Sequence, residues 1–140
     1  MKKNNVLTHI LAWIGTVLVS LPIFAPILFS VLALLHGGGL HFDYLMPAEL
    51  FIFILAGGAV LIWAALRKQL YSKQLIWGAA AAIATLAGSQ SLAVASGLAS
   101  GTREASGVWW MSVLALLGIY LCACVWIWVH GVRLLRSLQS

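Results

Sequence analysis

The sequence predicts an all-α membrane protein that folds as an up-down bundle of four transmembrane helices. Its 140 residues are 63% hydrophobic and 8% charged, whereas soluble domains carry about 25% charged residues. The apolar residues also fall into four long runs separated by short polar or glycine-rich segments. We therefore expect one integral membrane domain over residues 1–140, with approximate spans at 6–35, 46–66, 74–99 and 108–132.

The first apolar run is about twice as long as the core of a secretory signal peptide and has no small-residue cleavage site. We expect it to be retained as a helix. At about 1.5 Å per residue it exceeds the ~30 Å hydrocarbon layer, so it must tilt or bend. Pro22 and Pro26 lie one turn apart, and each removes a backbone donor and clashes with the preceding turn. The sequence therefore predicts a kink at these prolines.

The distribution of basic residues predicts the orientation. All of the eight Lys and Arg residues except Arg103 fall at the termini or in the link at 67–73. Cytoplasmic segments of membrane proteins are enriched in Lys and Arg, so both termini should be cytoplasmic. Basic ends and short links are typical of a multi-pass protein of a bacterial plasma membrane.

Small residues predict where helices approach closely. The third span has no charged residue after Lys73 and is rich in Gly, Ala and Ser. Such residues let helix backbones come together in lipid, where dispersion and hydrogen bonds drive association. One row of them can pack inside the bundle and another against a second subunit. The expected packing residues are Gly57, Gly78, Ala82, Ser89, Ala93, Gly97 and Gly101.

Three polar residues are candidates for an intramembrane site. Glu49 lies about one turn into the second span, and ionisable groups within spans are rare and often functional. Gln90 and Ser96 lie on the third span, with Ser96 at a depth similar to that of Glu49. Together they could line a proton, ion or small-solute pathway open to the exterior. Alternatively, Glu49 faces water at the headgroups and Gln90 bonds between helices.

The histidines suggest two further alternatives. His36, His41 and Asp43 lie in or beside the first link, and imidazole with carboxylate suits a divalent metal. His9 and His130 lie on the first and fourth spans at comparable depth, and these helices are neighbours in an up-down bundle. This pair could therefore ligate a b-type haem.

Several enzyme classes lack their signatures. The chain has no nucleophile elbow, HExxH, phosphate-binding loop or CxxC motif. With only three acidic residues and four histidines, acid–base chemistry has few possible participants. We therefore expect a non-enzymatic protein without a cofactor or nucleic-acid partner. It would be a subunit or accessory protein of a membrane complex, in contact with the bilayer and associated with itself or another membrane protein. The solute pathway and the haem or metal protein are the alternatives.

Overall fold

A computed structural model describes residues 2–36, 47–102, 104 and 106–140. These residues form four helices, and each is long and apolar enough to cross a membrane. This confirms the predicted all-helical class and the number of membrane-length helices. The helices are α1 (Lys2–Leu35), α2 (Pro47–Lys68), α3 (Ser72–Ala95) and α4 (Gly107–Gln139).

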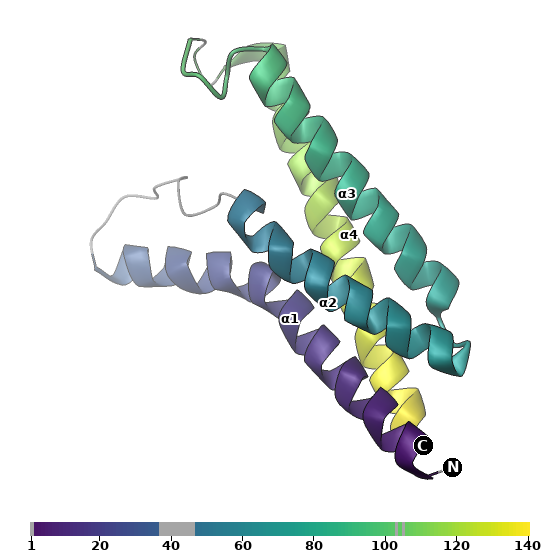
Figure 1. The fold of residues 1–140 in the computed structure, drawn as a ribbon. Coiled ribbons are helices and arrows are strands. Elements are labelled where there is room, and N and C mark those ends of the chain that lie inside the picture. Colours follow the sequence, from purple (N-terminus) through teal and green to yellow (C-terminus); the bar gives the residue numbers. More distant parts are fainter. Residues whose placement is uncertain (1, 37–46, 103, 105) are drawn as a thin grey trace.

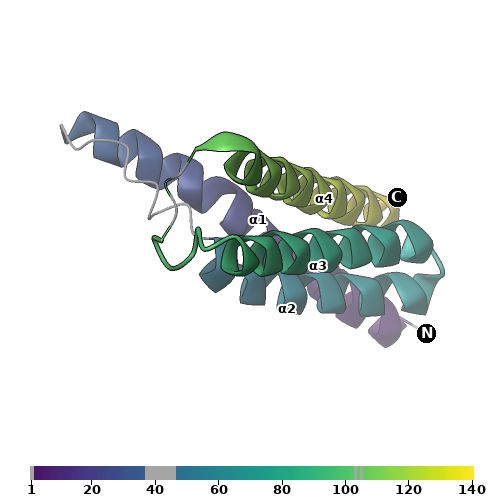
Figure 2. The ribbon, with the colours of Figure 1, turned by 90° about the horizontal axis from the view of Figure 1, so that it is seen from above.

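The four helices form two hairpins that pack against each other. The helix α1 packs mainly against α2, and α3 packs mainly against α4, while α1 also contacts α4 and joins the hairpins. Figures 1 and 2 show both termini and the α2–α3 turn together at one end of the molecule. At the opposite end the far half of α1 leads away from α3 and α4 (Figure 1). The hairpins therefore share one end and diverge at the other.

The first helix continues without a break through both prolines. Its 34 residues correspond to about 51 Å of helix, which is well above the ~30 Å hydrocarbon thickness. Pro22 is buried and Pro26 is half-buried. The bend that the sequence predicts at these two residues stays a prediction.

The structure places some helix ends differently from the apolar pattern. The helix α4 continues to Gln139, beyond the expected end of the apolar span at 132. The helix α3 ends at Ala95 because Gly97 adopts a left-handed backbone with φ of 77°. The N–H groups of Gly97 and Ala99 then donate to the carbonyls of Val94 and Ala93 at 3.1 and 3.0 Å. Glycine is the usual residue in this helix-ending conformation, which satisfies the last carbonyls.

A tight turn joins α2 to α3. Gln69 and Tyr71 both have left-handed backbones, with φ of 55° and 58°. The N–H of Leu70 donates to the carbonyl of Ala65 at 3.2 Å, which closes the end of α2. This conformation costs a residue with a side chain about 1–2 kcal/mol. In Tyr71 the aromatic ring packs edge-on against His130 with 6.1 Å between centroids, which helps to hold the turn.

Candidate interaction surfaces and polar sites

Three glycines and Leu61 form the junction of α1, α2 and α4. A Cβ atom built on Gly57 would lie 2.9 Å from the carbonyl oxygen of Gly15, and one on Gly15 would lie 3.0 Å from that of Gly57. A Cβ on Gly131 would lie 2.9 Å from Thr16 Oγ1 and 3.1 Å from Leu61 Cδ1. Leu61 is fully buried between them. The backbones of α1 and α2 therefore meet directly, as small residues permit in lipid, and Gly131 of α4 packs against side chains of these two helices.

The predicted packing residues of α3 divide between two environments. Gly78 faces α4, where a Cβ would lie 2.9 Å from Ile127 Cγ1. Ala82 and Ser89 follow on this side of the helix and are buried, and Ser89 Oγ donates to the carbonyl of Leu86 at 2.8 Å. Ala93 is half-buried. By contrast, Gly97 and Gly101 lie beyond the end of α3 with positive φ angles of 77° and 70°.

The polar candidates have different surroundings. Glu49 lies in the first turn of α2, and its side chain is outside the described part of the structure. Ser96 caps the end of α3, and its Oγ donates to the carbonyl of Ala93 at 3.3 Å. Gln90 is exposed on α3. The pathway lined by these three residues stays a prediction.

The second half of α3 exposes several small side chains and one carboxamide outside the α3–α4 contact. Ala84, Ala87 and Ser91 are exposed, as is Gln90. The Gln90 carboxamide makes no hydrogen bond to any of the residues that the structure describes. We call these four residues the α3 outer surface. It combines one carboxamide with three small side chains, and the larger side chains of Ile83 and Val94 are exposed on the same side of α3.

His130 lies in an aromatic pocket near the α2–α3 turn. It is 6% exposed, and its Nδ1–H can donate to the carbonyl of Trp126 at 2.8 Å. Its ring centroid lies 4.5 Å from that of Trp126 and 6.1 Å from that of Tyr71. Trp126 in turn donates from Nε1 to the carbonyl of Gln74 at 3.3 Å. The second half of α4 is thereby tied to the start of α3.

Of the remaining histidines, the structure describes His9 and His36. His9 is half-buried on α1, and the ring contacts seen for His130 are with Tyr71 and Trp126. The haem pair stays a prediction. His36 follows the end of α1, and its Nδ1 lies 2.9 Å from the carbonyl of Leu32. His41 and Asp43 lie outside the described residues, and the residues within the described ranges include no group of three or more metal-binding side chains.

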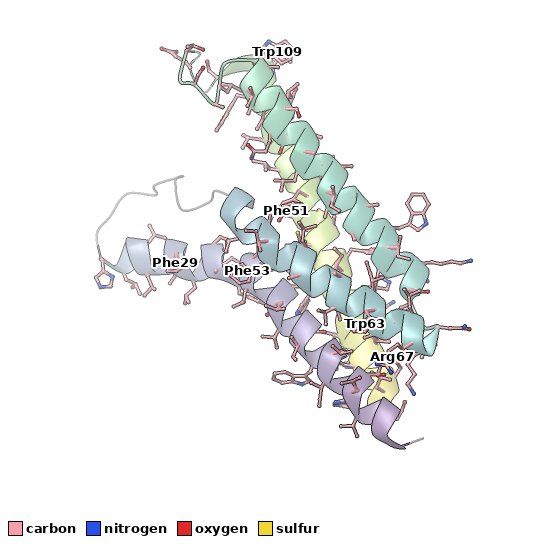
Figure 3. The ribbon with its side chains drawn as sticks, viewed as in Figure 1. Phe29, Phe51, Phe53, Trp63, Arg67 and Trp109 are labelled. Atoms are coloured by element: carbon pink, nitrogen blue, oxygen red, sulfur yellow. The ribbon has the colours of Figure 1, made fainter. Side chains whose placement is uncertain are left out.

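Aromatic and basic residues mark the two ends of the bundle. Figure 3 shows Trp63 and Arg67 near the end of α2, and Trp109 at the opposite end near the start of α4. Trp63 and Trp109 are 58% and 46% exposed. Tryptophan is enriched at both membrane–water interfaces, and an exposed tryptophan at each end of the bundle is compatible with helices of membrane-spanning length.

Some of these contacts were not expected from the sequence. Gly15, Thr16 and Gly131 carry the α1–α2–α4 junction, although only Gly57 was singled out. Small residues next to polar ones in apolar spans were a usable signal for them. The sequence did not indicate the contact between Tyr71 and His130, because this contact depends on the left-handed backbone of Tyr71 in the turn.

Comparison of the chain with protein-family models, with curated proteins and with solved structures finds no match. The fold therefore defines only a general class, a four-helix protein with helices of membrane-spanning dimensions.

Proposed function

We propose that this chain is a non-enzymatic subunit or accessory protein of a membrane complex, and that it binds its partner through the α3 outer surface. In this proposal the four helices cross a bacterial plasma membrane with both termini in the cytoplasm. The partner is a second copy of the chain or another membrane protein.

The exposed carboxamide of Gln90 carries the proposal. It follows Trp77 by about 20 Å along α3 and precedes Ala95 by about 8 Å, so it falls within a ~30 Å hydrocarbon layer. A carboxamide has two N–H donors and a carbonyl acceptor, and lipid chains can satisfy none of them. A polar group of a second membrane helix would satisfy them. The small side chains of Ala84, Ala87 and Ser91 would let its backbone approach between the larger Ile83 and Val94.

Substitution of Gln90 tests the proposal. We expect Gln90→Leu to weaken association about fivefold, since a hydrogen bond between membrane helices contributes roughly 1 kcal/mol. Single-molecule photobleaching in vesicles would measure self-association, and quantitative co-purification would measure a different partner. Gln74→Leu is the control, because Gln74 is exposed at the start of the same helix beside Lys73. Unchanged association in Gln90→Leu, or equal losses in both variants, would contradict the proposal.

A further inference from the structure

A groove with a volume of about 300 Å³ runs along the contact between α1 and α4. Its two hydroxyl groups are already bonded within α1. Thr16 Oγ1 donates to the carbonyl of Ala12 at 2.7 Å, and Ser20 Oγ donates to that of Val17 at 2.6 Å. The other lining side chains are Trp13, Val17, Phe24, Trp128, Val132 and Leu135. An occupant therefore meets an almost entirely apolar surface.

The groove is closed at one end and open at the other. Phe24 and Trp128 meet edge to face with 5.8 Å between their centroids, and this contact bridges the two walls. The opposite end is open and is lined by Trp13 and Leu135, the lining residues nearest the two chain termini along α1 and α4. Both termini lie at the same end of the bundle (Figure 2). Trp13 is 57% exposed. From Trp13 to Phe24 the groove is about 16 Å long at 1.5 Å per residue.

The length and the apolar lining of the groove suit an extended apolar occupant. The groove offers about 300 Å³ along about three turns of α1. A single extended hydrocarbon chain has the required shape and polarity.

The open end of the groove carries positive charge. Arg136 is exposed and lies one turn beyond Val132, where it continues the α4 wall. Arg133 is exposed on the same turns of α4. On α1, His9 lies one turn before Trp13 on the groove side of the helix. A negatively charged group just outside the open end would therefore meet cationic and hydrogen-bonding side chains.

We propose that this groove binds an anionic phospholipid, with one acyl chain in the groove and the headgroup beside Arg136. The acyl chain fits the length and the apolar lining of the groove. The negative charge of the headgroup complements the positive charge of Arg136 at the open end. A zwitterionic lipid with the same chains gains the apolar contacts without the charge contact. This inference is independent of the proposed partner surface, because the groove lies between α1 and α4 and the partner surface lies on α3.

Native mass spectrometry of the full-length protein in detergent would test the proposal. The probes are phosphatidylglycerol and phosphatidylcholine with identical acyl chains. We expect the protein to retain phosphatidylglycerol about fivefold more strongly, because one basic side chain near the membrane surface contributes this factor for an anionic lipid. Arg136→Gln should abolish the preference. Ser20→Leu, which fills the groove, should reduce retention of both lipids.

Two controls make the result decisive. Lys73→Gln removes an exposed basic residue at the same end of the bundle but on α3, and it should leave the preference intact. Val17→Phe fills the groove from its exposed wall, and it replaces Ser20→Leu if that variant loses its helical content. Equal retention of both lipids, equal losses in Lys73→Gln and Arg136→Gln, or full retention in a folded groove-filled variant would each overturn the proposal. Any of them would indicate lipid bound only at the general surface.

Discussion

At the scale of single residues, adjacent glycines in α2 have opposite environments. A Cβ on Gly57 would lie 2.9 Å from the Gly15 carbonyl oxygen and from Leu18 Cβ, whereas a Cβ on Gly58 would have no neighbour within 4 Å. The atoms around Gly57 belong largely to a backbone and to the base of a side chain, so they cannot turn aside. The same substitution should therefore have opposite effects at the two positions.

We expect Gly57→Ala to destabilise the protein by about 1–3 kcal/mol, the usual effect of overpacking a well-packed contact. Gly58→Ala should be neutral or should stabilise it by up to ~1 kcal/mol, because alanine favours a helix more than glycine does. The free energy of unfolding in mixed micelles would measure both effects. Equal stability of the two variants would mean that α1 and α2 do not meet at Gly57.

At the scale of elements, the α2–α3 turn contains two residues with similar backbones but different side-chain surroundings. Gln69 is exposed, whereas Tyr71 is half-buried against His130. Glycine relieves the cost of a left-handed backbone at either position. Only at Tyr71 does it also remove an aromatic contact.

We expect Gln69→Gly to stabilise the protein by about 0.5 kcal/mol, because the relieved strain slightly exceeds the extra flexibility of glycine in the unfolded chain. Tyr71→Gly should destabilise it by about 1–3 kcal/mol through loss of the half-buried ring. Thermal unfolding in detergent would compare the variants. A stabilised Tyr71→Gly variant would show that the ring contact with His130 contributes little.

The existence of the helices was predictable from the sequence, and their exact ends were less so. Apolar runs of sufficient length predict a helix in lipid because every backbone polar group must be bonded within the segment. The end of α3 depends instead on the backbone of Gly97, which glycine allows but does not require. The extension of α4 to Gln139 lies in a polar tail that hydropathy cannot assign to a helix.

The packing partners were less predictable than the helices. Gly57 could be recognised as a close-approach residue, but Gly15 and Gly131 could not be matched to it. Such a match depends on how each helix is rotated about its axis, and tertiary contacts decide that rotation. The same limit applied to Gln90. The sequence pattern allowed it either to line a pathway or to bond between helices, and it did not predict that Gln90 is exposed on α3.

At the scale of the whole molecule, both termini and the α2–α3 turn lie at one end of the bundle (Figure 1). The basic residues of the last turn of α2, Arg67 and Lys68, lie at this end. The link between α3 and α4 lies at the other end. The proposed orientation places the first end in the cytoplasm because its positive charge resists transfer across the membrane.

Labelling of single cysteines in intact cells would measure this orientation, after replacement of Cys122 and Cys124. A membrane-impermeant maleimide should label Thr102→Cys in intact cells. It should label Lys73→Cys and Ser140→Cys only after the cells are permeabilised. Labelling of both Lys73→Cys and Ser140→Cys in intact cells would reverse the orientation. Labelling of these two variants from opposite sides would show that α3 and α4 do not both cross the membrane.

The position of Leu61 also has a consequence for biosynthesis. This side chain contacts Gly15 in the first hairpin and Gly131 near the end of the chain. During translation α1 and α2 leave the ribosome long before the second of these contacts can form. One side of Leu61 therefore stays uncovered until α4 has been inserted and can pack against it. A ribosome stalled before Gly131 would hold an α1–α2 hairpin whose inner surface is accessible to membrane chaperones.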